Sequence, residues 1–165
     1  MIEQLSYLES TDRSDATISD CGKYRYALWR RWDDNKEIVK FVMLNPSTAD
    51  EIDDDATIRR CIGFAKSWGY GGICVANLFA YRSKDRSELK RVNDPIGPEN
   101  DKWLKQFDSG AGILVAAWGP DGALFDRDKT VKSMLSNLHY LELSKQGHPK
   151  HPLYLLGNLT PKRFE

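Results

Sequence analysis

The segment IVKFVMLNPS, residues 38–47, decides the fold of this chain. Its residues up to Leu44 are apolar except for Lys40, a composition typical of a strand that is buried on both faces of a parallel sheet. Pro46 must end the strand, because proline has no N–H group to donate to a neighbouring strand. The sequence therefore predicts a central strand whose carboxyl end opens directly into a polar loop.

The residues after this loop predict a βαβ unit. Asp55 is suited to cap a helix over residues 56–68, and a glycine-rich turn at 69–72 ends that helix. The apolar residues 73–79 then predict a second buried strand. Because a helix connects the two strands, they should lie parallel in one sheet.

Later segments extend this pattern into a single domain spanning residues 1–165. Residues 113–118 predict a third buried strand, and helices are expected at 98–107 and 128–138. The expected fold class is therefore α/β, with three layers (αβα) and a central, mostly parallel sheet.

The amino-terminal part is predicted to be less regular. Residues 1–20 are polar, with clusters of Ser, Thr and Asp, and predict an irregular arm. Residues 24–29 alternate large apolar residues with others, as a half-buried strand does. With turn-forming residues at 33–36, this strand is expected to form a hairpin with the central strand.

The composition is that of a globular protein without a charge bias. The chain has 24 Lys and Arg against 24 Asp and Glu, so its formal net charge is zero. A neutral chain does not attract polyanions through its total charge, although local basic patches still can. The apolar runs are too short to span a bilayer and the amino-terminus lacks the pattern of a signal peptide, so we expect a cytoplasmic location and no membrane partner.

No metal and no cofactor are expected. The cysteines, Cys21, Cys61 and Cys74, form no close pairs, which argues against disulfides and metal sites and favours buried, reduced thiols. The acidic residues at 50–55 lack the glycine and the spacing of a calcium loop, and the helix dipole explains them more simply. The chain has no phosphate loop, no Rossmann glycine motif and no nucleophile elbow.

Polar residues stand at the ends of the three buried strands: residues 45–47, Asn77, and the pair Trp118 and Gly119. Ligands of open parallel sheets bind beyond the carboxyl ends of the strands, so these residues should face one site. An unpaired buried amide costs about 1–3 kcal/mol, so Asn77 must bond either a ligand or the protein, in that case the loop at 80–98. Asparagine before proline also commonly begins a turn, which is the structural alternative for the first of these groups.

Histidines and basic residues could complete such a site. His148 and His151 can stabilise charge near neutral pH, or they can be solvated in a polar tail. Basic residues are candidates for phosphate contacts at the rim of a pocket, or for an ordinary solvated surface. The phosphate-contacting candidates are Arg82, Lys84, Arg86 and Lys150.

The motifs of the chain closely resemble a bacterial and phage family of unknown function, domain of unknown function 1643 (DUF1643). The motifs that carry the resemblance are MLNPSTAD at 43–50, TIRR at 57–60, NLFAYR at 77–82, GPEND at 97–101, AWG at 117–119 and HPLYL at 151–155. The resemblance covers most of the chain from Cys21 onward and implies no activity.

The order of the motifs is also distantly similar to the uracil-DNA glycosylase superfamily. Those enzymes have Asp or Asn followed by Pro after the first core strand, then Asn in an apolar strand, a proline-started helix, a strand ending in Trp-Gly or Leu-Gly, and a His-Pro loop. The matching elements here are Asn45-Pro46, Asn77, Pro98, Trp118-Gly119 and HPKHP at 148–152. This similarity implies a uracil-DNA glycosylase-like variant of the fold.

The similarity also implies roles for the matching residues. As catalytic groups, Asn45 would position a water near the sugar C1′, and His151, or alternatively His148, would donate to the departing base. Asn77 would read the edge of the base, and an aromatic ring would stack on it. The implied substrate-binding residues are Pro46, Ser47, Asn77, Tyr81, Trp118 and Gly119.

Three functions are open at this point. The leading hypothesis is a glycosylase-like hydrolase that handles the N-glycosidic bond of a nucleobase flipped out of DNA, as in base excision. The zero net charge and the acidic residues at 50–55 favour a hydrolase or transferase on free or modified nucleotides instead. The third is a non-catalytic module. In all three, the partner is a nucleic acid or a nucleotide.

Overall fold

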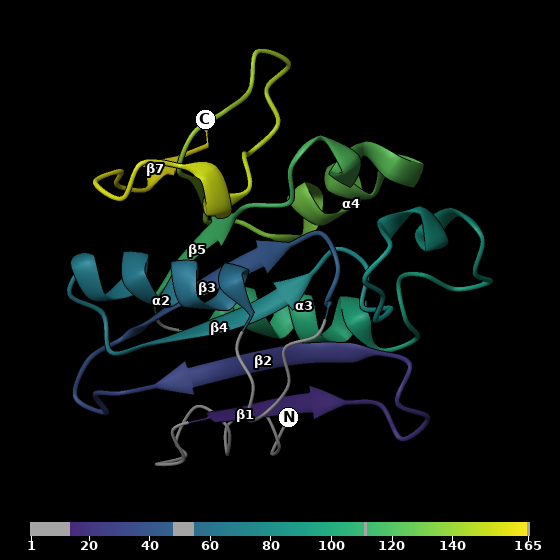
Figure 1. The fold of residues 1–165 in the computed structure, drawn as a ribbon, viewed down its shortest axis with the longest axis horizontal. Coiled ribbons are helices and arrows are strands. Elements are labelled where there is room, and N and C mark those ends of the chain that lie inside the picture. Colours follow the sequence, from purple (N-terminus) through teal and green to yellow (C-terminus); the bar gives the residue numbers. More distant parts are fainter. Residues whose placement is uncertain (1–13, 48–54, 111, 165) are drawn as a thin grey trace.

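The computed structural model describes residues 14–47, 55–110 and 112–164 of the chain (Figure 1). Its centre is a seven-stranded sheet with the order β1-β2-β4-β3-β5-β6-β7. The strands are β1 (Ser14–Ile18), β2 (Arg25–Arg31), β3 (Ile38–Met43), β4 (Gly72–Asn77), β5 (Ile113–Ala116), β6 (Leu138–Tyr140) and β7 (Lys162–Arg163). The helices are α2 (Ala56–Ser67), α3 (Asn100–Ser109) and α4 (Arg127–Met134), with short 3₁₀-helices η1 (Arg86–Lys90), η2 (Pro120–Asp126) and η3 (Pro152–Tyr154).

The α/β class is confirmed, but the sheet is mixed rather than mostly parallel. β3 pairs in parallel with β4 on one side and with β5 on the other, and β5 pairs in parallel with β6. The pairs β1–β2, β2–β4 and β6–β7 are antiparallel. The prediction of a mostly parallel sheet was wrong because periodicity locates strands without fixing the direction of the edge strands.

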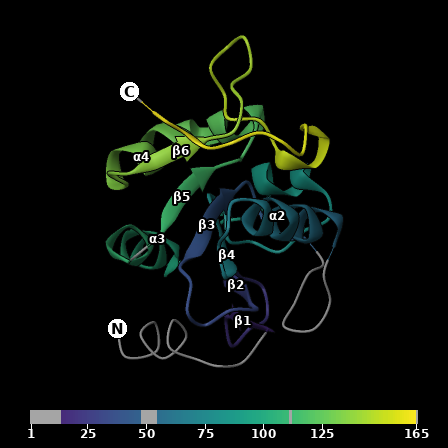
Figure 2. The same ribbon diagram turned by 90° about the vertical axis from the view of Figure 1, so that its left-hand side faces the viewer.

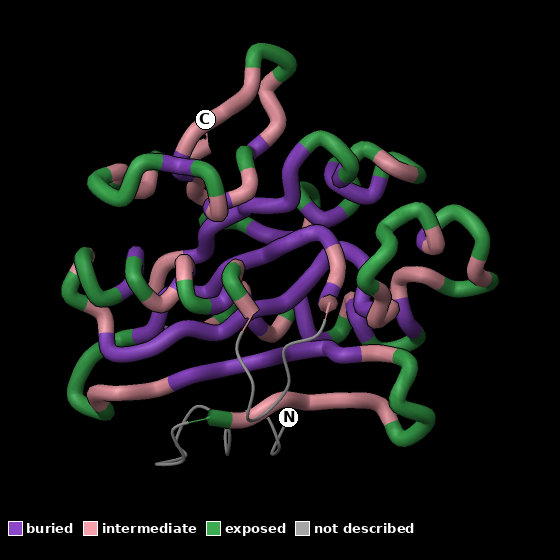
Figure 3. Tube along the Cα trace, in the orientation of Figure 1, coloured by how far each residue is buried: buried purple, intermediate pink, exposed green. Residues whose placement is uncertain are grey.

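Helices cover both faces of the sheet, in three layers (Figure 2). α2 lies on one face, where Ile58, Cys61 and Phe64 join Phe41 and Val75 in one apolar cluster. α3 and α4 lie on the other face, in a second cluster that includes Trp103, Phe107, Val131, Val42 and Ala76. The central strands β3 and β4 are buried along their whole length (Figure 3), which explains their almost unbroken apolar sequence.

Lys40 is the exception in the middle of β3. Its Nζ atom donates a hydrogen bond to the main-chain carbonyl of Phe107, at 2.6 Å, beneath α3. Burial lowers the pKa of this ammonium group, because the charged form loses solvation. The carbonyl at the end of α3 satisfies the lysine, so one charged residue is accommodated in the sheet interior.

The predicted hairpin of residues 24–29 with the central strand is wrong. β2 and β3 follow each other in the chain, yet β4 lies between them in the sheet. β3 already has a parallel partner on each side, so β2 pairs with the free edge of β4. The prediction paired residues 24–29 with β3 because the two segments are neighbours in the sequence. In the sheet, β4 of the βαβ unit occupies that place beside β3.

The amino-terminal arm is also more regular than expected. Residues 14–18 of the predicted irregular arm form β1, which pairs with β2. Residues 1–13 lie outside the described part of the chain. Within β2, Ala27 pairs with Thr17 and Arg25 pairs with Ile18, so Tyr26 is an extra residue that forms a β-bulge.

Helix boundaries shift where tertiary contacts override local propensity. The helix expected from Pro98 begins at Asn100, and the helix expected to reach residue 138 ends at Met134. Leu138 instead begins β6 and pairs with Leu114 of β5. A strand partner thus replaces the last predicted helical turn.

The expectation of buried thiols holds for two cysteines. Cys61 and Cys74 are buried and free, whereas Cys21 is free and exposed. Cys21 lies in the turn between β1 and β2, where Gly22 donates its N–H to the Ser19 carbonyl. No helix in the described ranges combines the length and the apolar character needed to cross a membrane.

Candidate functional site

A pocket of about 160 Å³ lies at the carboxyl ends of β3 and β4, and we call it the strand-end pocket. In the parallel pairing Met43 stands opposite Asn77, so Asn45 and Asn77 leave neighbouring strands at the same edge. Its lining residues are Arg25, Met43, Leu44, Asn45, Ser47, Asp55, Thr57, Ile58, Val75, Asn77 and His151. The structure therefore brings Asn45, Asn77 and His151 together, although they lie far apart in the sequence.

Asn77 is the most unusual side chain of the strand-end pocket. It is only 1% exposed, and neither its Nδ2 nor its Oδ1 atom has a hydrogen-bond partner among the described residues. The Asn77 side chain therefore does not pin the loop at 80–98; Asn100 of α3 instead donates its Nδ2–H groups to the main-chain carbonyls of Asn77 (2.9 Å) and Leu78 (3.1 Å), at the end of β4. A buried amide that lacks partners costs about 1–3 kcal/mol, which is typical of a group kept for a ligand.

The amide NH₂ group of Asn45 is hydrogen-bonded within the protein. Its Nδ2 atom donates to the carbonyl oxygens of Ser83, at 3.0 Å, and Pro46, at 3.2 Å. Pro46 is buried and its carbonyl also accepts the Ser83 N–H at 3.0 Å, so Pro46 anchors the loop after β4 and does not line the pocket. The turn-forming role of Asn45 is therefore real, and it fixes the amide so that Oδ1 is left to accept from a ligand or water.

Asp55 brings a carboxylate into the strand-end pocket. Its Oδ1 atom accepts the N–H of Ile58 at 2.9 Å, which confirms the predicted helix cap. Its Oδ2 atom accepts from the Ser47 hydroxyl at 2.8 Å. Sequence analysis assigned Asp55 only the capping role; its position just after the strand-end loop was the available signal that it also reaches the site.

His151 enters the pocket from the carboxyl-terminal tail. Its Nδ1 atom accepts the N–H of Leu153 at 3.2 Å, capping η3. A neutral ring with Nδ1 as acceptor carries its proton on Nε2, which makes that atom a hydrogen-bond donor. Burial lowers the pKa of His151 below its ordinary value, with Asp55 opposing this shift and Arg86 adding to it. The neutral form of the ring is therefore favoured.

Arg25 is a pocket residue that sequence analysis missed. It is 3% exposed and is the first residue of β2, directly before the bulge at Tyr26 that changes the alternation of side chains. The bulge places Arg25 on the same face as Leu28, toward α2. Loss of solvation lowers the pKa of Arg25 to about 10, against the opposing charge of Asp55, so the guanidinium stays charged at neutral pH.

Besides Pro46, four predicted catalytic or substrate-binding residues lie outside the strand-end pocket. His148 is anchored through its main-chain N–H to the Ser144 hydroxyl at 3.1 Å, away from the lining. Trp118 is 2% exposed and η2 covers it so closely that a side chain at position 122 would collide with its ring. Gly119 donates its N–H to the carbonyl of Pro149 at 2.8 Å, which ties the tail to the end of β5.

Tyr81 is the fourth of these residues. It lines a separate pocket of about 370 Å³ together with Lys23 and Tyr24. Its ring meets the Tyr24 ring edge-on, at 6.1 Å between centroids. Stacking of Tyr81 or Trp118 on a ligand in the strand-end pocket therefore has no support in this arrangement.

The predicted phosphate-contacting residues have different surroundings. Arg86 forms an ion pair with Asp121 at 3.0 Å, and Lys150 pairs with Glu142 at 2.5 Å. Arg82 donates to the carbonyl of Gly22 at 3.3 Å, and Lys84 is exposed. Their contact with phosphate stays a prediction.

No cluster of three or more His, Cys, Asp or Glu that could hold a metal occurs in the part of the chain that the structure describes. The acidic residues 50–54 lie outside that part.

Fold and site together define a three-layer α/β protein with a polar pocket at the carboxyl edge of its parallel strands. The chain belongs to a family described as "Protein of unknown function (DUF1643)", whose family model matches residues 25–153. Every residue that lines the strand-end pocket, from Arg25 to His151, falls within the matched range. Neither the curated proteins nor the solved structures match the chain. The similarity to uracil-DNA glycosylases thus rests on motif order alone.

Proposed function

We propose that the protein is a glycosylase-like hydrolase that holds a nucleobase in the strand-end pocket and cleaves its N-glycosidic bond. The observation that carries the proposal is the buried amide of Asn77, with donor and acceptor both unused by the described residues. Such an amide is complementary to an adjacent acceptor and donor on the edge of a base. Pairing with a base would recover the free energy that the empty amide forfeits.

The size of the pocket supports a base rather than a whole nucleotide. Its volume is about 160 Å³. Pockets for drug-sized ligands measure about 300–1,000 Å³, so this one suits a single small ring. If a base occupies this pocket, its sugar lies at the pocket mouth. The polar side chains of the lining can then reach the bond between base and sugar.

The lining also offers groups for each part of the reaction. Breaking the C1′–N bond leaves the electron pair on the base, and the Nε2–H of His151 can donate a hydrogen bond to the oxygen that gains negative charge. The Oδ1 atom of Asn45 can orient the water whose oxygen bonds to C1′. That water loses a proton, and Asp55 is the one carboxylate among the described lining residues that can accept it.

Base release from a substrate panel tests the proposal. The panel comprises single- and double-stranded oligonucleotides and free nucleotides that carry uracil, hypoxanthine or modified pyrimidines, with the released base measured by mass spectrometry. We expect release from at least one member, and no release by the Asn77→Leu variant. Intact substrates throughout the panel, with folded protein, would refute the proposal.

The non-catalytic alternative makes a different prediction in the same samples. A binding module would retain the base-containing ligand without releasing the base, and Asn77→Leu would weaken that binding. Equilibrium binding measured beside base release therefore separates the two functions.

A further inference from the structure

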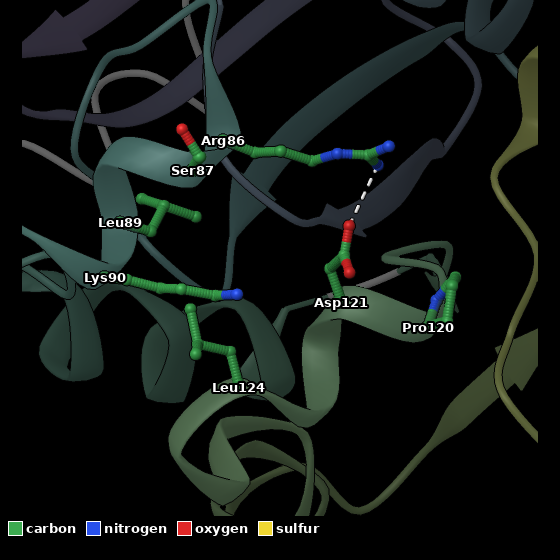
Figure 4. Close-up of a pocket in the computed structure, with 7 residues that line it drawn as sticks. All are labelled: Arg86, Ser87, Leu89, Lys90, Pro120, Asp121 and Leu124. Atoms are coloured by element: carbon green, nitrogen blue, oxygen red, sulfur yellow. Dashed lines mark ion pairs between the residues drawn. The ribbon is translucent and has the colours of Figure 1, made fainter.

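A second pocket, of about 440 Å³, lies between η1 and η2, and we call it the rim pocket (Figure 4). η1 follows the end of β4, and η2 follows the end of β5, so both belong to the carboxyl edge of the sheet. Its lining residues are Arg86, Ser87, Leu89, Lys90, Pro120, Asp121 and Leu124. Nothing in the proposed cleavage step uses this pocket.

The polar wall of the rim pocket carries two cations against one anion. Arg86 and Lys90 extend from η1 toward η2, from which Asp121 extends toward Arg86 (Figure 4). The Arg86–Asp121 pair is 70% and 50% exposed, and ion pairs so exposed contribute little stability. Lys90 is exposed and makes no ion pair within the described ranges. A phosphate group therefore has one unpaired cation and one weakly held cation available.

An exposed aromatic residue follows the rim pocket in the chain. Phe125 directly follows Leu124 of the rim pocket, and 62% of it is exposed to solvent. Its ring contacts the Phe79 ring edge-on, at 6.5 Å between centroids.

The backbone at this ring is strained. Phe125 and Asp126 adopt φ values of 56° and 54°, in the left-handed region that bulky residues rarely occupy. Strain of this kind persists where surrounding structure enforces it, and it concentrates at binding sites. The strained backbone at Phe125 holds a large apolar ring in solvent, so burial of the ring does not offset the cost of the strain.

One loop connects the two pockets. Asn45, which lines the strand-end pocket, donates its Nδ2–H to the carbonyl of Ser83 at 3.0 Å, and Arg86 of the rim pocket follows Ser83 by three residues. The strand-end pocket has room for a base only, so the sugar and its phosphates must continue outside it.

We propose that the rim pocket binds the nucleotide next to the reacting one, with its phosphate against Arg86 and Lys90 and its base stacked on Phe125. Cations that follow the phosphates, combined with a ring that stacks on a base, are how proteins hold single-stranded nucleic acid. The inference rests on the proposed function and narrows it, because the substrate becomes a chain of at least two nucleotides rather than a free nucleotide.

Binding without catalysis tests this inference. The probe is a labelled single-stranded oligonucleotide with a non-cleavable C-nucleoside at the reacting position, compared with the corresponding mononucleotide. Affinities are measured by fluorescence anisotropy over a range of salt concentrations. For the unaltered protein we expect the oligonucleotide to bind at least about tenfold more tightly than the mononucleotide, since one stacked base alone accounts for such a factor.

Two variants locate the effect. Phe125→Gly removes the ring and relieves the backbone strain, so it should fold at least as stably and weaken oligonucleotide binding about tenfold. Lys90→Gln should weaken it and lower the salt slope by about 1. Both should leave mononucleotide affinity unchanged. Lys105→Gln, an exposed lysine on α3, is the matched control and should change neither affinity.

Equal affinities for the two probes, or variants that bind like the unaltered protein, would overturn the inference. Because the probe is not cleaved, the result does not depend on catalysis. Loss of oligonucleotide binding in Phe125→Gly and Lys90→Gln supports the rim pocket even if no base is ever released, in which case only the cleavage proposal fails.

Discussion

The strand-end pocket and the rim pocket lie along the same edge of the sheet but are built in opposite ways. The strand-end pocket includes the buried polar side chains of Arg25 and Asn77, which extend from β2 and β4. The rim pocket has polar side chains that are exposed on two short 3₁₀-helices, and a solvent-exposed ion pair joins the two helices. The contrast teaches that the first pocket can discriminate between ligands by hydrogen bonds, whereas the second can contribute affinity with little discrimination.

The largest effect is expected from Asn77→Leu, which removes the unpartnered amide and keeps its size. Base release should fall by about 10³-fold or more, because a site built to hydrogen-bond its substrate loses most of its activity without that bond. Stability should rise by about 1–3 kcal/mol, since a buried polar group without partners is removed. Activity assays and thermal unfolding measure the two changes.

Asn158→Leu, at an exposed position, is the control for this substitution and should affect neither quantity. A destabilised Asn77→Leu protein would mean that the amide has a partner in the folded chain, and the contrast between the two pockets would then disappear.

The next effect concerns His151. His151→Gln should lower base release by about 10²–10³-fold, the typical loss of one preorganised donor. His148→Gln is the matched control and should retain activity, because His148 lies outside the strand-end pocket. Equal losses in both variants would show that the tail, and not one ring, matters.

The same residue predicts a pH dependence. Burial holds the pKa of His151 below 6.5 in the folded protein, so its neutral form is favoured there. Its contribution to stability and activity should be complete above pH 6.5 and should be lost as pH falls through the lower, folded-state pKa. Protonation of Nδ1 removes the acceptor of the Leu153 N–H and loosens η3. The pH profile of kcat/KM measures this acid limb, which should be absent in His151→Gln.

Asp55 should separate catalysis from helix capping. Asp55→Asn keeps a good cap for α2 and removes the charge, so stability should be nearly unchanged while base release falls by about 10²-fold. Asp55→Ala should also lose about 1 kcal/mol of stability with the cap. Thermal unfolding and base release of both variants provide the comparison, and full activity in Asp55→Asn would exclude Asp55 as the proton acceptor.

The smallest effect is expected at the rim pocket. Asp121→Asn removes one partner of an exposed ion pair, so stability should change by less than about 1 kcal/mol. Arg86 is then freed, and oligonucleotide binding should tighten by a few-fold at low salt and little at high salt. Anisotropy titrations measure this change, and a loss of affinity would contradict the role assigned to Arg86.

The features that could be predicted are those determined by residues close together in the sequence. The apolar run before Asn45 defined β3, and a capping residue before an apolar stripe placed α2 after Asp55. Parallel pairing of β3 with β4 followed from the connecting helix, and it brought Asn45 and Asn77 to one edge. The sequence therefore predicted the edge of the sheet at which the strand-end pocket lies.

The features that could not be predicted depend on residues far apart in the sequence, or on a one-residue shift in strand register. The pairing of β2 with β4 joins segments separated by the whole of β3 and α2. The entry of Arg25 into the strand-end pocket depends on the bulge at Tyr26, which ordinary strand alternation does not reveal. The burial of Trp118 depends on η2, whose glycine at position 122 allows close approach.

The position of β4 between β2 and β3 also bears on the order in which the protein folds during its synthesis. β2 leaves the ribosome before β3, yet its partner on that side does not exist until residues 72–77 have followed. The unit β3–α2–β4 makes mostly local contacts and can form first, whereas β2 must wait with an unpaired edge. We therefore expect the nascent chain to assemble the part of the strand-end pocket that contains Asn45 and Asn77 before Arg25 joins it, and His151 to complete the pocket last.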